Sequence, residues 1–225
     1  MSTSVLRAYV VPSTPRVIGI PSGVDPGHAD RRDITWQPSA LDRHERWLAI
    51  DQRGATVLLT GLPAAGKTTI AVELERRLVD SGQSAYLLDG DNIRHGLSED
   101  LGFSPDDRSE HLRRVGHVAR LMADAGTIAL VAMISPLAAD RAYLRAAHEL
   151  AELPFAEVFV DTPLAECERR DPKGLYARAR AGEVRDFTGV DAPYEPPVRP
   201  ELRVDTSTTG LQEAVCQIIE LLGAQ

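Results

Sequence analysis

The stretch Gly61-Leu62-Pro63-Ala64-Ala65-Gly66-Lys67-Thr68 matches the pattern G-x-x-x-x-G-K-[ST], which is typical of a loop that binds nucleotide phosphates. It follows an apolar run at residues 56–60 and precedes a segment with Ile70, Leu74 and Leu78 at helical spacing. A strand, the loop and a helix are the context that the motif requires. The sequence therefore predicts a P-loop whose backbone N–H groups and following helix N-terminus bind phosphate oxygens.

Lysine is rare in this chain, and one of its two lysines, Lys67, lies in the predicted P-loop. The other is Lys173, and the remaining basic residues are arginines. A compact ammonium fits between the β- and γ-phosphates of ATP better than a planar guanidinium does. We therefore expect Lys67 to contact these phosphates and the Thr68 hydroxyl to bind Mg²⁺. The residues expected to bind ATP are Gly61, Leu62, Pro63, Ala64, Ala65, Gly66, Lys67, Thr68 and Thr69.

Composition limits the classes of function that fit the chain. Its 225 residues, 43% hydrophobic and 26% charged, suit one α/β domain with a buried core. The net charge of −8 argues against binding to a nucleic-acid backbone. No apolar run is long enough to span a membrane and no signal peptide is recognisable, so we expect no membrane partner and a cytoplasmic location. Cys167 and Cys216 are expected to stay reduced.

From residue 55 onward, predicted strands and helices alternate, which favours an α/β fold with a parallel sheet covered by helices on both faces. Ligands of such sheets bind beyond the carboxyl ends of the strands. Residues 1–33 are rich in proline and glycine and are expected to form an irregular arm before a kinase-like domain at 34–225. Residues 171–195, also rich in glycine, proline and charge, are expected to form a mobile lid. The predicted strands are 56–60, 85–88, 127–134, 158–160 and 202–204, and the predicted helices follow the P-loop, Ser104, Ala138, a cap at Thr162-Pro163, and residue 210.

A second cluster of polar residues, Asp89-Gly90-Asp91, directly follows the second predicted strand. One carboxylate can hold a metal-bound water while the other accepts a proton from a hydroxyl. Arg94, three residues further on, can bind a phosphate or sulfate. The expected metal-binding residues are Thr68, Asp89 and Asp91, and the expected catalytic residues are Lys67, Asp91 and Asp89.

Several further blocks lie in an order that resembles one known family. The most specific of them are Asp89-Gly90-Asp91-Asn92 and Asp171-Pro172-Lys173-Gly174-Leu175-Tyr176. From about Ile34 to the C-terminus the chain resembles the adenylylsulfate kinases (APS kinases). The blocks that carry the resemblance are 88–97, 100–104, 107–108, 113–116, 134–136, 171–176, 179–182 and 187–190.

The resemblance implies transfer of a phosphoryl group from Mg-ATP to the 3′-hydroxyl of adenosine 5′-phosphosulfate (APS), giving 3′-phosphoadenosine 5′-phosphosulfate and ADP. It implies that Phe103 and Phe187 stack on the substrate adenine, and the polar residues around Phe187 suggest that its ring lies outside the core. Ser135 matches a family serine described as phosphorylated, although a role in lining the substrate is the simpler interpretation. The substrate-binding residues that the resemblance implies are Asp91, Arg94, Phe103, Arg108, His111, Ile134, Ser135, Lys173, Gly174, Leu175, Phe187 and Thr188.

The chain departs from the family pattern at several positions. His111 stands where the family usually has an asparagine, and Pro63, Ala64 and Ala65 replace small Ser and Gly residues in the loop. No acidic residue ends the strand predicted at 127–134, so Asp89 or Asp91 must serve the metal. The family resemblance also suggests a homodimer and a functional link to an ATP sulfurylase.

Two other functions are compatible with the same motifs. One is phosphorylation of another small hydroxyl metabolite, and the other is a weakly active nucleotide-binding regulatory homologue. A GTPase-like switch is disfavoured because neither lysine follows an asparagine, as the guanine-reading Asn-Lys-x-Asp motif requires.

Overall fold

A computed structural model describes residue 35 and residues 37–223 of the chain. The predicted arm at 1–33 lies outside the described residues. The chain divides into two units, residues 1–40 and residues 41–225, and the fold below is that of the second unit.

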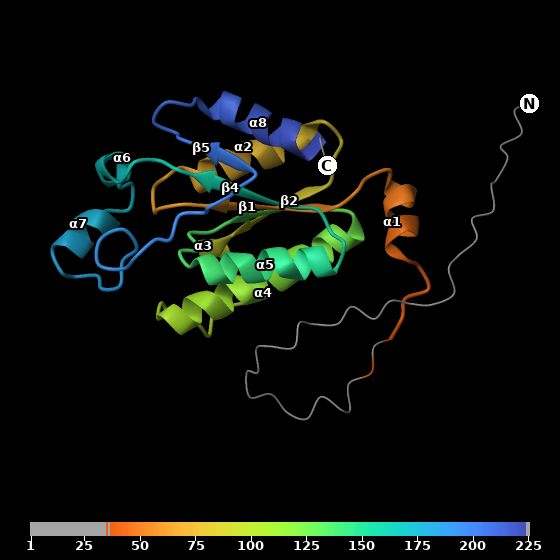
Figure 1. Cartoon of the computed structure of the whole chain (residues 1–225), viewed down its shortest axis with the longest axis horizontal. Helices are drawn as coiled ribbons and strands as arrows, with labels where there is room; N and C mark the ends of the chain where they lie inside the picture. The colour runs from red at the N-terminus through yellow and green to blue at the C-terminus, as the bar shows by residue number, and fades with distance from the viewer. Residues whose placement is uncertain (1–34, 36, 224–225) are drawn as a thin grey trace, which may run out of the picture. The chain divides into compact units, whose positions relative to one another are not determined.

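The second unit is built on a five-stranded parallel sheet with strand order β2-β3-β1-β4-β5, as the α/β prediction required. Figure 1 shows α2 and α8 on one face of the sheet and α4 and α5 on the other. The strands are β1 (Ala55–Thr60), β2 (Ala85–Asp89), β3 (Ile128–Ala132), β4 (Phe155–Val160) and β5 (Leu202–Val204). The helices are α1 (Arg43–Ile50), α2 (Lys67–Asp80), α3 (Gly90–Ile93), α4 (Pro105–Ala125), α5 (Ala138–Leu150), α6 (Leu164–Arg170), α7 (Leu175–Arg180) and α8 (Leu211–Gly223).

Local signals in the sequence account for the long helix α4. The Ser104 side chain accepts a hydrogen bond from the Asp107 backbone N–H, and Pro105 opens the helix. Gly126 ends it with φ of 100°, a left-handed conformation that glycine adopts without strain. Both ends of α4 agree with the prediction.

Each face of the sheet buries its own hydrophobic cluster. On the α2 and α8 face, Ile70, Leu74 and Ile218 pack against Val57 and Leu130. On the α4 and α5 face, a second cluster joins both helices to β1, β2, β3 and β4, and it includes Leu58, Leu88, Leu112, Val115 and Leu144. The two clusters pack helices on both faces of the sheet, and because the strands are parallel their carboxyl ends lie together at one edge.

His148 is a fully buried polar residue in the α5 side of the core. Its Nδ1–H donates to the Leu144 carbonyl at 2.8 Å, and its Nε2 accepts from the Thr56 hydroxyl at 2.9 Å. Burial lowers the pKa of His148 from 6.5 to about 4. The folded protein therefore keeps this imidazole neutral under conditions in which the unfolded chain would protonate it.

We expect His148 to make the free energy of unfolding pH-dependent. Between the unfolded pKa of 6.5 and the folded pKa of about 4, only the unfolded chain takes up the proton, so stability falls as the pH falls. The contribution lost between about pH 7 and about pH 5 is about 2 kcal/mol. Urea unfolding of the wild type and of His148→Gln at both pH values measures it, and equal pH dependence in the two proteins would contradict it. His111 and His117 titrate in both proteins and cancel in the comparison.

Candidate functional site

The carboxyl ends of β2, β3 and β1 bring the sequence-predicted polar segments side by side. Strand β3 lies between β2 and β1, with Ala132 opposite both Asp89 and Leu59. The loop that carries Ser135 therefore lies between the P-loop and the Asp89–Asp91 segment. Figure 1 shows α6 and α7 at this same edge of the sheet.

Backbone geometry and two distant hydroxyls hold the P-loop in shape. Gly61 has φ of 148°, and a Cβ there would lie 2.4 Å from the Val160 carbonyl oxygen, so only glycine fits. The Ala65 carbonyl accepts hydrogen bonds at 2.9 Å from the hydroxyls of both Thr162 and Thr206. The sequence predicted a cap at Thr162-Pro163. Pro163 is the N-cap of α6, without a side-chain hydrogen bond, and the Thr162 hydroxyl supports the P-loop.

Lys67 is buried at the start of α2 and folds back over its own loop. Its Nζ donates to the carbonyl oxygens of Gly61 at 3.0 Å and Leu62 at 2.7 Å. Burial lowers the pKa of the ammonium from 10.5 to about 8, although the nearby Asp89 and Asp91 carboxylates oppose this shift. A polyphosphate entering the loop would supply negative charge to a cation that has lost much of its hydration.

Asp89 links the P-loop helix to the acidic segment. Its carboxylate caps α3 by accepting from the backbone N–H groups of Asp91 at 3.0 Å and Asn92 at 3.3 Å, and it accepts from the Thr68 hydroxyl at 2.8 Å. Asp91 is exposed over 68% of its side chain and forms an ion pair with Lys173 at 2.5 Å. Asp89 thus occupies a constrained position and Asp91 an open one.

The Thr68 and Asp89 pair fits a hard cation. A hydroxyl and a carboxylate are oxygen ligands of the kind that Mg²⁺ binds, usually with phosphate oxygens and water completing the shell. Among residues 35 and 37–223, no group of three or more His, Cys, Asp or Glu side chains could hold a metal by itself. The protein residues that could hold Mg²⁺ here are therefore few, as at other nucleotide-dependent sites.

Arg94 and Arg108 carry charges that no described carboxylate neutralises by an ion pair. Arg94 donates to the carbonyls of Leu101 at 3.3 Å and Gly102 at 2.7 Å, and Arg108 donates to the Phe103 carbonyl at 2.8 Å. Burial lowers the pKa of the Arg94 guanidinium. Both cations are therefore positioned by neutral groups and remain able to bind an anion.

Phe103 and Phe187 lie in different surroundings. Phe103 is 65% exposed, with the Arg94 guanidinium 4.5 Å from its ring centroid. Phe187 is only 8% exposed and packs edge-on against Tyr176, with ring centroids 5.0 Å apart. The expectation that Phe187 lies outside the core was wrong. Arg108 nevertheless joins the two segments, because it donates to the Phe103 carbonyl, to the Asp186 carbonyl at 2.5 Å and to the Thr188 hydroxyl at 3.1 Å.

His111 is buried beneath the acidic segment. Its Nε2 lies 3.0 Å from the Gly90 carbonyl oxygen and donates to it, which leaves a buried Nδ1 with no partner among the described residues. Burial lowers the pKa of His111, and the nearby Arg94 cation lowers it further, so the imidazole is neutral near pH 7. His111 therefore supports the backbone between Asp89 and Asp91.

Ile134 and Ser135 follow β3 and face the P-loop. The Ile134 carbonyl accepts from the Thr60 hydroxyl at 2.6 Å and from the Gly61 N–H at 3.5 Å. Ser135 has φ of 47°, which is uncommon for a residue with a side chain, and its buried Oγ has no described partner. A strained residue with an unpaired hydroxyl next to a P-loop is a candidate for contact with a substrate.

The predicted lid at 171–195 contains one helix that the sequence did not reveal, α7. Gly174 starts this helix with φ of 63°, Leu175 packs on the core, and Lys173 reaches Asp91. Beyond α7, the chain returns across the sheet edge, where the Tyr194 hydroxyl lies 2.9 Å from that of Thr60.

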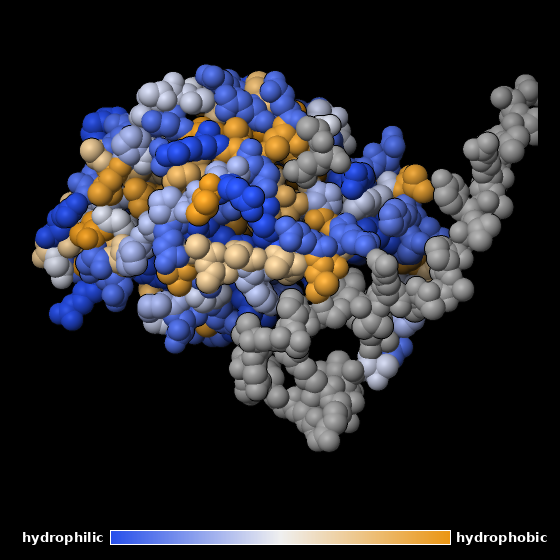
Figure 2. All heavy atoms as spheres, viewed as in Figure 1, coloured by the Kyte–Doolittle hydropathy of each residue, from blue (hydrophilic) through white to orange (hydrophobic). Residues whose placement is uncertain are grey.

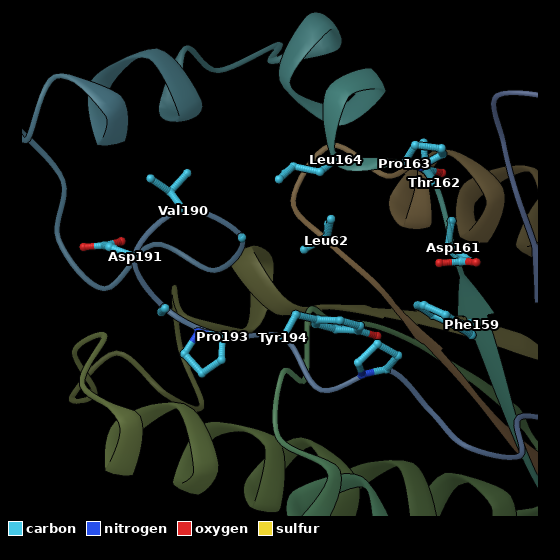
Figure 3. Close-up of a pocket in the computed structure, with 14 residues that line it drawn as sticks. Leu62, Phe159, Asp161, Thr162, Pro163, Leu164, Val190, Asp191, Pro193 and Tyr194 are labelled. Atoms are coloured by element: carbon cyan, nitrogen blue, oxygen red, sulfur yellow. The ribbon is translucent and has the colours of Figure 1, made fainter.

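A cavity of about 520 Å³ lies between the P-loop and residues 189–196. Figure 3 shows Leu62 and Leu164 across from Pro193 and Tyr194, with Phe159 of β4 beside Tyr194. The rings of Phe159 and Tyr194 stack with centroids 5.8 Å apart. Among the described residues that line this cavity, Leu62 is the one that the sequence predicted to bind a ligand. The cavity is therefore separate from the acidic segment and from Arg94 and Arg108.

A parallel sheet with a P-loop after β1, an acidic segment after β2 and a helical segment over the same edge defines the class of P-loop kinases. The adenylylsulphate kinase family model matches residues 53–205 of this chain. The chain belongs to the adenylylsulphate kinase family.

Individual relatives agree with this assignment. The chain is 52% identical to the adenylyl-sulfate kinase of Penicillium chrysogenum over 84% of this chain and 93% of that protein. It is 56% identical to the bifunctional enzyme CysN/CysC of Mycobacterium tuberculosis H37Rv over 76% of this chain, which spans only 28% of that longer protein. A structure of the M. tuberculosis APS kinase CysC in complex with AMPPNP and APS superposes with a TM-score of 0.74 at 55% identity, covering 76% of this chain and 99% of that one.

Hydrophilic residues cover much of the face that Figure 2 shows. Within residues 35 and 37–223, none of the helices has both the length and the apolar character needed to cross a membrane.

Proposed function

We propose that this chain transfers the γ-phosphoryl group of Mg-ATP to the 3′-hydroxyl of APS, giving ADP and 3′-phosphoadenosine 5′-phosphosulfate. The observation that carries the proposal is the acidic segment. Asp89 bonds the P-loop residue Thr68 at 2.8 Å, and Asp91, three residues before Arg94, pairs with Lys173. Carboxylates next to both a phosphate-binding loop and an anion-binding arginine suit transfer between two bound anionic nucleotides. The M. tuberculosis structure, which holds AMPPNP and APS, supports both ligand assignments.

The residues of the P-loop would hold the donor. The backbone N–H groups of the P-loop, except at Pro63, which has none, would contact the β-phosphate, and Lys67 would leave the carbonyls of its own loop to contact the β- and γ-phosphates. When bound, Mg²⁺ neutralises charge on these phosphates, and Thr68 and Asp89 are the residues that would hold it. The P-loop thus orients the γ-phosphate toward the acidic segment.

The acceptor would lie on the Arg94 side of Asp91. Arg94, Arg108 and Lys173 bind the phosphosulfate, and the exposed ring of Phe103 stacks on the adenine. The 3′-oxygen forms the new bond to the γ-phosphorus as the bond to the β,γ-bridging oxygen breaks, and Asp91 accepts the hydroxyl proton. Asp91 must first separate from Lys173, which is exposed and free to turn toward the sulfate.

An assay with the purified protein tests the proposal directly. With Mg-ATP and micromolar APS, we expect ADP and the 3′-phosphorylated product to form in equal amounts, measured by coupled ADP detection and by chromatography. Phe103→Ala should raise the KM for APS about tenfold or more without changing the KM for ATP, because stacking on a base is worth about 1–3 kcal/mol. Absence of turnover with APS would contradict the proposal. Turnover of a hydroxyl acceptor that has no purine, at a rate unchanged by Phe103→Ala, would favour one of the alternative functions.

The substrate itself implies a partner. APS must be supplied by an enzyme that joins sulfate to the adenylyl group of ATP, so we propose a functional link to an ATP sulfurylase. The bifunctional M. tuberculosis relative, of which this chain spans 28%, is in keeping with such a link. Homodimer formation stays a prediction.

A further inference from the structure

An ion pair lies buried between α5 and β4, and neither of its members, Arg141 and Glu157, is assigned above to a ligand. The Arg141 side chain is 3% exposed, and its Nε donates to Glu157 Oε1 at 2.7 Å. Removing two charges from water is costly, and an attraction between them offsets the cost only when their remaining hydrogen-bonding groups are also satisfied. The partners of the other Arg141 nitrogens therefore show what the pair holds in place.

The remaining nitrogens of Arg141 reach two segments at the edge of the site. Nη1 donates to the Ser135 carbonyl at 2.6 Å, and Nη2 donates to the Glu195 carbonyl at 2.6 Å. The guanidinium also lies 5.7 Å from the centroid of the Tyr194 ring. One planar group thus connects β4, the loop after β3 and the segment that closes over the sheet edge.

Those two segments also hold each other. The Glu195 N–H donates to the Pro136 carbonyl at 2.9 Å, and the Glu195 carboxylate accepts from the Ala138 N–H at 2.7 Å. The Tyr194 hydroxyl lies 2.9 Å from the hydroxyl of Thr60, the residue just before the P-loop. In Figure 3, Pro193 and Tyr194 form the wall of the cavity opposite Leu62. Because the two segments are bonded to each other, displacing Arg141 would disturb Ser135 and residues 193–196 together.

We propose that Arg141 is a positioning residue for phosphoryl transfer, which it supports by fixing Ser135 and residues 193–196 rather than by touching a substrate. The inference rests on the function proposed above. Ser135 needs such support because its φ of 47° is unfavourable and its hydroxyl has no partner to hold it. Arginine is suited to the task because its rigid fork spans three acceptors, whereas the compact ammonium of lysine does not.

Arg145 is a matched control on the same helix. It is one turn further along α5 and pairs with the same carboxylate, with Nη2 3.3 Å from Glu157 Oε2. Its other contacts are hydrogen bonds to Glu201, at 2.7 Å and 2.8 Å, and a contact with the Phe155 ring, whose centroid lies 5.1 Å from its guanidinium. Among the described contacts of Arg145, none is with Ser135 or Glu195. The variants Arg141→Lys and Arg145→Lys therefore make the same chemical change beside the same Glu157, but only the first loosens the site.

Kinetics and hydrogen exchange on the full chain test the proposal together. In Arg141→Lys we expect kcat/KM for APS to fall about 30-fold while KM for ATP changes less than about threefold, since small displacements of positioned groups cost up to about 100-fold. In Arg145→Lys all constants should stay within about threefold of the wild type. Peptides covering 134–140 and 192–197 should exchange faster in Arg141→Lys alone, with peptides of β1 unchanged as an internal reference.

Each of these measurements either supports or overturns the role of Arg141. Equal effects of the two substitutions, or parallel losses for APS and ATP, would overturn the proposal. If Arg141→Lys does not fold, Glu157→Gln replaces it in the test. A neutral partner orients the Arg141 guanidinium less firmly, so kcat/KM for APS should fall about fivefold and the same peptides should exchange faster. Unchanged values would overturn the proposal. If the wild type is inactive with APS, only the proposed function is rejected. The role of Arg141 is then judged by hydrogen exchange in Arg141→Lys: unchanged exchange at 134–140 and 192–197 refutes it, and accelerated exchange supports it.

Discussion

Replacing Lys67 with methionine will lower kcat for ATP-dependent phosphoryl transfer by about 10²- to 10³-fold, and arginine at this position will not restore it. Lys67 is buried at the first turn of α2, where its ammonium donates hydrogen bonds to the carbonyls of Gly61 and Leu62. In that dry environment its charge acts on bound phosphates with little screening, and losing such a group costs about 10²- to 10³-fold or more. Arginine fails because its planar guanidinium does not replace a compact ammonium between the β- and γ-phosphates.

The other lysine provides the comparison for this prediction. Lys173 is exposed, so Lys173→Met should reduce kcat/KM for APS by only about tenfold. Coupled ADP release measures all the variants, with circular dichroism and thermal unfolding to verify the fold. A Lys67→Met enzyme that keeps more than about a tenth of the wild-type rate would contradict the assignment.

The lowered pKa of Lys67 adds a pH dependence with a defined sign. In the free protein this pKa is about 8, and bound phosphate must raise it because the ammonium is then paired. ATP should therefore bind about tenfold more weakly for each pH unit above 8, and this dependence should be absent from Lys67→Arg. Titration calorimetry at several pH values would detect the difference.

Periodicity and capping predicted most of the sheet and its covering helices. The run at 127–134 is apolar on both faces, as a central parallel strand requires, and β3 occupies Ile128–Ala132. Helix α1 was missed because Trp47 is its only buried residue, so no amphipathic spacing is visible. Its position depends on tertiary contacts, among them the hydrogen bond from the Trp47 indole to the Ala123 carbonyl.

The residues of the candidate site were predictable where they belong to one short sequence motif. Lys67 and Thr68 belong to such a motif, and Thr68 bonds Asp89 as a shared metal site would require. Thr206 supports the Ala65 carbonyl from 141 residues away, a relationship that no local pattern encodes. Arg141 was missed for the same reason, since an arginine on a helix usually lies in solvent and its three partners come from separate segments.

Asp89→Asn is expected to lower kcat about 10³-fold, and Asp91→Asn only about 10²-fold. The sequence favoured Asp91 as the main catalytic carboxylate, but the structure gives Asp89 the more constrained position. Asp89 uses one oxygen to cap α3 and the other to accept from Thr68, and it is nearly buried. Asparagine offers one acceptor instead of two and no charge, so both the cap and the Mg²⁺ interaction weaken together.

The two carboxylates should also respond differently to magnesium. Asp89→Asn should raise the Mg²⁺ concentration for half-maximal activity about tenfold or more, because it removes the carboxylate that, among the described residues, is bonded to Thr68. Asp91→Asn should leave that concentration within about threefold, since Asp91 is exposed and pairs with Lys173 rather than with Thr68. Asp80→Asn, an exposed acid at the far end of α2, serves as the control and should be neutral. If instead Asp91→Asn changes the magnesium requirement and Asp89→Asn does not, the roles of the two residues are exchanged and the constrained carboxylate serves mainly to cap α3.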